Sequence, residues 1–375
     1  MRQGENVADR STEPESEGLA STELASAEGN RRAAWALVVL APVSAEVTFS
    51  GVTMPYMWLL LPALVVMYGA GVLLLRELTV RFGGGWPSLL VMGLIYELVE
   101  DGLGLQALTS PNLYNAPEWG PRVLGFNTTY WESQIGYHTV FSVLIPVLLA
   151  DLLFPRHRGR PYLRRGGLVL AGVAAVIGVA LLRVLVAATE DPGYQTPLPV
   201  VLGVLAAVAV LLFVALRVLP GRTPLPPPGG HAPRPFLVAL TAGAASACFL
   251  GLLVPLGLPP DGPAVGSGAW VLVPMASAAA VAVWAGRLIH RWSGSADWSD
   301  SYWIRLAGGA LIGRTLFVVL TAPAANAYDW ARAGVAIAVG TVLIAVMAFL
   351  LVRLDQRVRR GTADGRAVAE TQPAG

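Results

Sequence analysis

The segment Trp86–Leu108, WPSLLVMGLIYELVEDGLGLQAL, combines a long apolar run with three acidic residues, Glu97, Glu100 and Asp101. About 20 residues at about 1.5 Å per residue cross a hydrocarbon core of about 30 Å, so its length predicts a transmembrane helix. A carboxylate at bilayer depth is costly and is seldom present without a role. The segment therefore predicts a membrane fold and the place where a functional site is expected.

The whole chain has the composition of a membrane protein. Of its 375 residues, 55% are hydrophobic and 13% are charged, and its mean hydropathy is +0.59, which excludes a soluble multidomain protein. All 26 basic residues are arginine, so Schiff-base catalysis by a lysine is excluded. The single cysteine, Cys248, excludes an intramolecular disulfide and a thiolate cluster. We expect no metal, no cofactor and no nucleic-acid partner.

Apolar runs of transmembrane length recur along the chain. They predict an all-α, polytopic helical transmembrane bundle of about ten spans. The first run is the shortest and contains Pro42 and Glu46. The predicted spans lie at 33–50, 56–78, 86–105, 135–154, 166–188, 198–219, 235–256, 269–290, 302–322 and 333–353.

The arginines predict the orientation of these spans, because cytoplasmic loops retain an excess of positive charge. With the N-terminus inside, only Arg122 and Arg332 fall in outer loops, whereas Glu118, Glu190 and Asp261 lie in outer connections. An even number of spans explains this pattern, so both termini are expected in the cytoplasm. The arginine-only, Ala- and Gly-rich composition is typical of a bacterial protein, which places it in the cytoplasmic (inner) membrane.

Composition also divides the chain into parts. Polar tails at both ends are expected to be disordered in the cytoplasm, and a Pro- and Gly-rich linker that cannot continue a helix separates two groups of spans. The one long outer loop carries aromatic residues suited to an interfacial belt or to a lid over the span ends. The predicted parts are a tail at 1–32, a six-span bundle at 33–219 with the outer loop at 106–134, a linker at 220–234, a four-span bundle at 235–353 and a tail at 354–375.

The three acids of the third span are expected to act together. Glu97 lies about 16 Å from the cytoplasmic end of its span, near mid-membrane, and Glu100 and Asp101 lie about one turn further out. Their spacing places them on one helix face, where three ionised groups would repel strongly, so at least one is expected to carry a proton near neutral pH. Gly93 and Gly104 flank them and allow another helix to approach closely.

The fourth span carries a polar stripe at similar depth. Gln134, His138 and Ser142 follow an i, i+4, i+8 pattern, so they share a face that could be turned toward the acids. A histidine near an interface more often caps a helix or bonds a loop than binds a ligand. His138 is therefore a site candidate after the acids, and Gln134 is a secondary one.

Three further charged residues, Glu46, Arg183 and Arg314, lie at a similar depth in other predicted spans. An intramembrane arginine requires a carboxylate partner, so Arg314 is expected to pair with one of the three acids. Arg183 and Glu46 are secondary candidates, and for all three residues a structural role as hydrogen-bonding glue is an equal alternative. At the cytoplasmic ends of their spans, Arg76-Glu77 and Asp151 need no role beyond anchoring by snorkelling.

Two segments resemble a group of uncharacterised bacterial and archaeal polytopic membrane proteins. The first, RELTVRFGGGWPSLLVMGLIYELVEDGLGLQALTSP at 76–111, is similar to the group's pattern of Arg-Glu-Leu, a Gly-Trp turn, then Tyr-Gly and paired acids before Gly-Leu. The second, YHTVFSVLIPVLLADLLFP at 137–155, places His138 and a proline as in that group. The chain departs from the pattern with Glu97 in place of the usual glycine and Asp101 in place of the second glutamate. The resemblance implies a shared fold and a focal site, but no reaction.

A weaker similarity is to the CAAX-protease and bacteriocin-processing membrane family. In that comparison Glu100-Asp101 would stand for the first acid pair and His138 for one histidine. The chain lacks an arginine at the family's spacing after the acids, and it lacks the Phe-x-x-x-His motif.

Three hypotheses about function follow. The leading one is a transporter or permease-like protein, not an enzyme, whose outward-facing acidic site of Glu97, Glu100 and Asp101 binds a cation or carries protons. The first alternative is an intramembrane hydrolase or lipid-modifying enzyme in which Glu100 is the general base and His138 positions water. The second is a non-catalytic membrane partner protein. The expected partners of the protein are the lipid bilayer and a small molecule or ion that the sequence does not identify.

Overall fold

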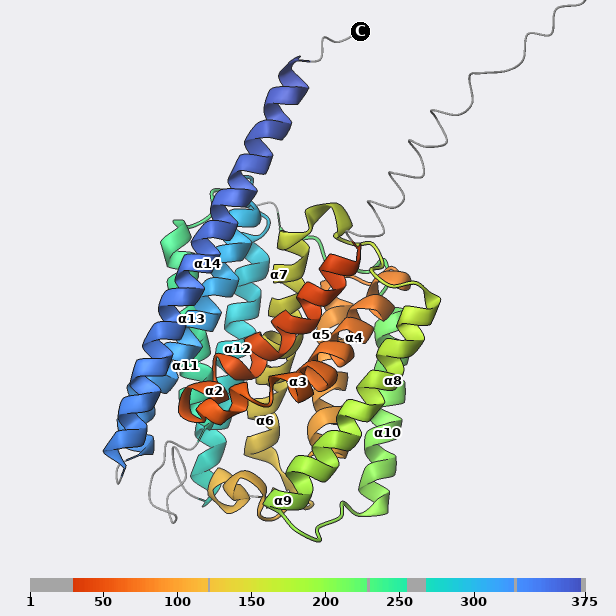
Figure 1. Ribbon diagram of the computed structural model, residues 1–375, viewed down its shortest axis with the longest axis vertical. Helices are drawn as coiled ribbons and strands as arrows, with labels where there is room; N and C mark the ends of the chain where they lie inside the picture. The colour runs from red at the N-terminus through yellow and green to blue at the C-terminus, as the bar shows by residue number, and fades with distance from the viewer. Residues whose placement is uncertain (1–29, 121, 228–229, 255–267, 327–328, 372–375) are drawn as a thin grey trace, which may run out of the picture.

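The computed structural model describes residues 30–371, except 121, 228–229, 255–267 and 327–328, and these are almost entirely helical (Figure 1). The strands among them are β1 (Arg122–Val123) and β2 (Phe126–Asn127), which form a short antiparallel pair. The all-α class predicted from composition is confirmed. The predicted N-terminal tail lies outside the described residues up to residue 29.

Within the described part of the chain, eight helices are long and apolar enough to cross a membrane. Two predicted spans are helical but do not count among them. The first is residues 30–42 with the π-helical segment η1 (Val43–Val47), and the second is α5 (Trp86–Glu97) with η4 (Leu98–Gly104), where three acids lower the hydropathy. The eight are Leu61–Arg81, Thr128–Leu153, Arg165–Glu190, Leu198–Val218, Pro235–Leu253, Leu272–Trp292, Asp300–Ala325 and Trp330–Gly361.

Most of these spans are built from more than one helical segment. In chain order the further α-helices are α2 (Ser50–Thr53), α3 (Leu61–Leu64), α4 (Ala70–Arg81), α6 (Thr128–Tyr137), α7 (Ile145–Leu153), α8 (Arg165–Leu182), α9 (Ala188–Glu190), α10 (Leu198–Phe213), α11 (Pro235–Leu253), α12 (Leu272–Trp292), α13 (Asp300–Ala325) and α14 (Trp330–Thr371). The further π-helical segments are η3 (Val65–Gly69), η6 (His138–Leu144), η8 (Arg183–Ala187) and η9 (Val214–Val218), and the 3₁₀ segments are η2 (Pro55–Trp58), η5 (Leu113–Trp119), η7 (Pro155–His157) and η10 (Gly268–Val271).

The helix α14 corrects one prediction. The C-terminal tail was expected to be disordered from residue 354, but α14 continues without a break to Thr371. The segment contains Gly361 and Gly365 but no proline before Pro373, and its alanines and arginines favour a helix.

The two groups of spans share a buried interface. In Figure 1, α11–α14 lie on one side of the molecule and α4, α5, α8 and α10 lie on the other, with α6 and α7 between them. One apolar cluster joins Phe141 and Leu152 of the first group to Leu250 and Ile304 of the second. The segments on either side of the predicted linker are therefore packed against each other.

Both described ends of the chain lie at the same end of the bundle. In Figure 1 the first helix begins at the top of the bundle and α14 projects beyond the same end, whereas α9 lies at the opposite end. This arrangement agrees with an even number of spans. The assignment of that end to the cytoplasm rests on the arginine distribution.

The centre of the bundle is built from π-helical turns. Their i→i−5 hydrogen bonds include Leu105 N to Glu100 O at 2.8 Å and Thr48 N to Val43 O at 3.2 Å. A π-turn inserts one extra residue into a helix, changes the direction of the side chains that follow, and occurs often at functional sites. The segments η1, η3, η4 and η6 carry most of the polar side chains described next.

Candidate functional site: a histidine between carboxylates

The acids of the third span face the fourth span in the interior of the bundle. The approach is close because α5 has Gly93 at the contact, where a Cβ atom would lie 2.7 Å from the Cα of Thr139. The prediction that this glycine permits a close helix approach is confirmed. Glu100 and Asp101 on η4 therefore lie opposite His138 on η6.

His138 lies between two carboxylates. Its Nδ1 is 3.3 Å from Oε2 of Glu100, and its Nε2 is 3.5 Å from Oδ2 of Asp101. Nδ1 is also 3.0 Å from Oγ of Ser142, one turn along the same helix. The imidazole can thus exchange a proton with a partner on either side. We call Glu97, Glu100, Asp101 and His138 the acid–histidine cluster.

Two acids of the cluster, Glu97 and Asp101, accept hydrogen bonds from side chains of α6. Trp131 Nε1 donates to Oε2 of Glu97 at 3.1 Å, and Tyr130 Oη donates to Oδ1 of Asp101 at 3.0 Å. The other oxygen of Glu97, Oε1, is buried and has no hydrogen-bond partner among the described residues. The same is true of Oε2 of Glu100 and Oδ2 of Asp101. Buried carboxylate oxygens without a donor are costly, so each acid of the cluster has one oxygen that could accept a proton or a cation.

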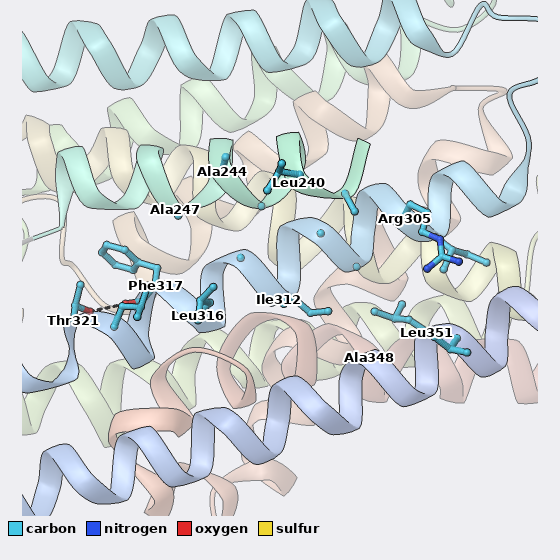
Figure 2. A pocket seen from close by; sticks show the side chains of 18 residues that line it. Leu240, Ala244, Ala247, Arg305, Ile312, Leu316, Phe317, Thr321, Ala348 and Leu351 are labelled. Carbon is cyan, nitrogen blue, oxygen red and sulfur yellow. Dashed lines mark hydrogen bonds between the residues drawn. The ribbon is translucent and has the colours of Figure 1, made fainter. Parts of the chain in front are cut away.

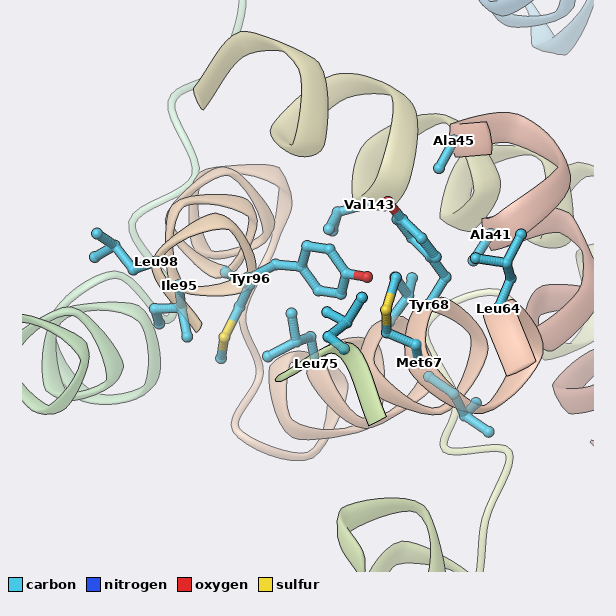
Figure 3. Packing of buried hydrophobic residues seen from close by; sticks show 14 of the residues in the cluster. Ala41, Ala45, Leu64, Met67, Tyr68, Leu75, Ile95, Tyr96, Leu98 and Val143 are labelled. Atoms are coloured by element: carbon cyan, nitrogen blue, oxygen red, sulfur yellow. The ribbon is translucent and has the colours of Figure 1, made fainter. Parts of the chain in front are cut away.

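Glu46 and two tyrosines complete the surroundings. Tyr68 Oη on η3 donates to Oε1 of Glu46 on η1 at 2.6 Å. The rings of Tyr68 and Tyr96 lie with their centroids 6.2 Å and 5.7 Å from that of His138, and Figure 3 shows the two tyrosines extending toward each other between their helices. Sequence reasoning missed both. The available signal was a tyrosine hydroxyl inside a transmembrane run, because a buried hydroxyl needs a polar partner.

Arg314 contradicts the predicted pairing with the acids of the third span. Its guanidinium donates to the backbone oxygens of Ser44 at 2.6 Å and Ala45 at 3.3 Å, and to Oγ1 of Thr48. It also lies over the ring of Phe141, 4.1 Å from the centroid. The physical reason is that backbone oxygens of the π-turn η1 lie within reach at this depth, and a planar donor with five N–H groups can bond several acceptors at once.

The two remaining secondary candidates lie outside the cluster. The amide of Gln134 donates to the neighbouring Ser133 Oγ at 3.3 Å. Arg183 donates to the backbone oxygen of Leu103 at 2.9 Å and to Oε1 of Gln195 at 2.5 Å, so it fixes the outer end of η4. Of the predicted set, the structure brings together the three acids and His138, with Glu46 nearby.

The outer loop covers the cluster. Tyr114 stacks on the ring of Tyr130 with a centroid distance of 6.3 Å, Trp119 packs edge-on against it at 5.1 Å, and Tyr130 in turn hydrogen-bonds Asp101. This arrangement resembles a lid, one of the two roles that the sequence left open for these aromatic residues. The side chains of the cluster are accordingly enclosed: relative exposures are 0% for Glu97 and Asp101, 4% for Glu100 and 3% for His138.

The loop is fixed by a carboxylate beyond the end of the fifth span. Ser110 Oγ and Asn112 Nδ2 donate to the two oxygens of Asp191 at 2.5 Å and 3.0 Å. Burial opposes the ionisation of Asp191, but these hydrogen bonds outweigh it and hold its pKa below the usual range. A cavity of about 230 Å³ lies near this outer end and is lined by Gln106, Arg183 and others. The acid–histidine cluster does not line it.

The opposite, predicted cytoplasmic end is closed by a buried ion network, and this corrects the snorkelling interpretation of Arg76 and Glu77. Arg76 pairs with Asp151 at 3.0 Å and lies 3.4 Å above the ring centroid of Tyr162. Glu77 accepts backbone N–H bonds from Tyr162 at 2.6 Å and Leu163 at 3.1 Å. The loop after α7 therefore folds back and covers these charges.

Among the described residues, no group of three or more His, Cys, Asp or Glu side chains is arranged to hold a metal ion. The acid–histidine cluster is an enclosed set of three carboxylates and one imidazole. Fold and site together define a multi-pass helical membrane protein with a buried acidic centre.

The chain belongs to an uncharacterised membrane protein family, whose model matches residues 36–369. This match supports the resemblance to an uncharacterised membrane protein group and does not extend to the CAAX-protease family. None of the curated proteins and none of the solved structures matches the chain.

Proposed function

We propose that this protein is a membrane transporter that couples the movement of its substrate to protons held by the acid–histidine cluster. The observation that carries the proposal is the position of His138, with one ring nitrogen at Glu100 and the other at Asp101. Groups placed in this way can pass a proton along the series by small rotations of the ring.

The balance of charge supports proton or cation binding. Four carboxylates, those of Glu46 and the three acids, lie near one histidine at the centre of the bundle. Arg314, the buried arginine beside them, directs its guanidinium to backbone oxygens and not to a carboxylate. An uncompensated excess of negative charge is very unfavourable at low dielectric, so the site is expected to hold protons or to exchange them for a cation.

Closure at both ends fits an occluded state of a transport cycle. The aromatic lid covers the cluster on one side, and the Arg76–Glu77–Asp151 network closes the other. In alternating access, one closure opens while the other stays shut. The outward-facing form is then the state in which the lid over Tyr130 has moved.

Proteoliposomes test the proposal. Purified protein is reconstituted with a pH-sensitive dye inside the vesicles, and outward gradients of Na⁺, K⁺ and a panel of amino acids and sugars are imposed. We expect one gradient to drive a change in lumenal pH, and we expect Glu97→Gln and Glu100→Gln to abolish it. The matched control is Glu190→Gln, the same substitution at an exposed position of α9 outside the cluster. Equal proton movement in the wild type and both cluster variants would refute the coupling role.

One observation favours a second function. Ser142 Oγ, His138 and Asp101 form a series with separations of 3.0 Å and 3.5 Å, which has the order of groups found in nucleophilic hydrolases. In that case Ser142 would be the nucleophile, and a fluorophosphonate probe would label the wild type but not Ser142→Ala. Under the transport proposal Ser142→Ala keeps its proton coupling and the probe labels neither protein.

A further inference from the structure

A long apolar groove follows α13 between α11 and α14 (Figure 2), and none of its lining residues belongs to the acid–histidine cluster. Its volume is about 610 Å³. It runs along α13 from Ile304 to Thr321, which corresponds to about 26 Å at about 1.5 Å per residue. This length is close to the hydrocarbon thickness of a bilayer, about 30 Å.

Missing side chains create the groove. A Cβ atom added to Gly313 on α13 would lie 2.3 Å from the Cα of Gly243 on α11, and one added to Gly309 would lie 2.1 Å from the backbone oxygen of Ala239. The two backbones are therefore in direct contact. The walls carry small residues such as Ala244 on α11 and Ala348 on α14.

The groove offers hydrocarbon surface along almost its whole length. The hydroxyl of Thr321, near one end, donates to the backbone oxygen of Phe317 at 2.8 Å, as the dashed line in Figure 2 marks. Leucines form the rim, and Leu240 and Leu320 are 54% and 70% exposed. A polar solute would lose its hydration here without gaining hydrogen bonds, so the occupant must be apolar over this length.

The other end of the groove is cationic. Arg305 lies there, and its Nη2 is 2.7 Å from Oδ2 of Asp355. Arg359 binds the second oxygen of the same carboxylate at 3.2 Å. Residues 353–360 of α14 carry four arginines and one acid, so this end has an excess of positive charge, and the buried Nε of Arg305 has no hydrogen-bond partner among the described residues. By the distribution of arginines, this end faces the cytoplasm.

The groove is long and narrow, with a volume of about 610 Å³ along about 26 Å of α13. A single hydrocarbon chain has this form, and the cationic end suits the phosphate of an anionic lipid.

We propose that this groove binds one acyl chain of an anionic phospholipid from the cytoplasmic leaflet, with the lipid phosphate at Arg305. Anionic headgroups are attracted to arginines at the membrane surface, and the apolar groove holds the chain. The proposal is independent of the transport function and concerns a different surface of the protein.

Native mass spectrometry of the detergent-purified full chain tests it, with phosphatidylglycerol and phosphatidylcholine of identical acyl chains as probes. We expect phosphatidylglycerol to bind more tightly to the wild type. Arg305→Gln should remove about fivefold of this preference, the effect of about 1 kcal/mol per arginine near the surface. Ala244→Trp fills the groove and should abolish the binding of both lipids.

Two matched variants serve as controls, Ala280→Trp on an exposed face of α12 and Arg291→Gln at the end of the same helix; both should bind lipid as the wild type does. Equal binding of the two lipids by the wild type would overturn the headgroup assignment. Unchanged lipid binding by Ala244→Trp would overturn the groove itself. A dimer that carries no lipid and dissociates in Ala244→Trp would show instead that a second copy occupies this face.

Discussion

Replacing Arg314 by alanine removes three hydrogen bonds from the centre of the bundle. The acceptors are the backbone oxygens of Ser44 and Ala45 and the hydroxyl of Thr48, all on or beside the π-turn η1. Polar contacts between transmembrane helices contribute about 0.6–1.7 kcal/mol each, so we expect Arg314→Ala to lower the free energy of unfolding by about 2–5 kcal/mol.

The assay is thermal or denaturant unfolding in detergent, followed by intrinsic tryptophan fluorescence. Arg314→Lys should recover only part of the loss, because an ammonium group cannot reach three acceptors with the geometry of a planar fork. Arg353→Ala is the matched control, since Arg353 is exposed and lies over the ring of Phe349. It should change stability by less than about 0.5 kcal/mol.

A double variant separates the two roles that an intramembrane arginine can have. If Arg314 holds η1 through its carbonyl groups, adding Glu46→Gln to Arg314→Ala leaves the protein as unstable as before. If Arg314 acts as a counter-charge to the nearest acid, removing both charges restores stability. That recovery, or an Arg314→Ala variant as stable as the control, would refute the capping role.

Two further predictions concern the helix contact and the outer loop. Gly313→Leu should destabilise the protein by about 1–3 kcal/mol or more, because a Cβ atom there overlaps α11. The folded yield in size-exclusion chromatography should fall accordingly. The control Gly334→Leu, with no atom within 4 Å of the added Cβ, should leave the stability and the yield unchanged. Asp191 has a lowered pKa, so its stabilisation of the outer loop is complete above the unfolded value of about 3.9 and is lost as pH falls through the lower folded value. Hydrogen exchange of residues 106–116, corrected for the intrinsic rate, should rise below about pH 4 in the wild type but not in Asp191→Asn; identical profiles would contradict this.

Much of the fold follows from hydropathy and charge. The eight apolar helices lie where apolar runs predict them. The span at 86–105 was found from its length although its acids lower its hydropathy, and the structure makes it a buried central helix. The positions of π-turns were not predictable, because one extra residue in a helix leaves the apolar pattern almost unchanged.

The site was predictable where it depends on helix periodicity. The i, i+4 relation of His138 and Ser142 correctly placed both on the face that meets Glu100 and Asp101. The predicted partner of Arg314 was wrong because we expected a buried arginine to need a carboxylate. Backbone carbonyl groups of a π-turn also satisfy it.

The charges at the predicted cytoplasmic end were misjudged for a different reason. Arg76 and Glu77 lie at a helix end, where sequence reasoning expects contact with water. The loop after α7 folds over them and supplies backbone N–H donors from residues about 85 positions away. Contacts of this range depend on the path of the loop, which composition does not specify.

The most direct test of the central claim is infrared difference spectroscopy of the purified protein across a change of pH. The acid–histidine cluster is proposed to carry protons at membrane depth, so the wild type should show carboxylic-acid C=O bands near neutral pH. These bands should decrease in Glu97→Gln and Glu100→Gln and persist in Glu190→Gln, which replaces an exposed carboxyl of α9. A wild-type spectrum without such bands, or bands unchanged in both cluster variants, would contradict the account.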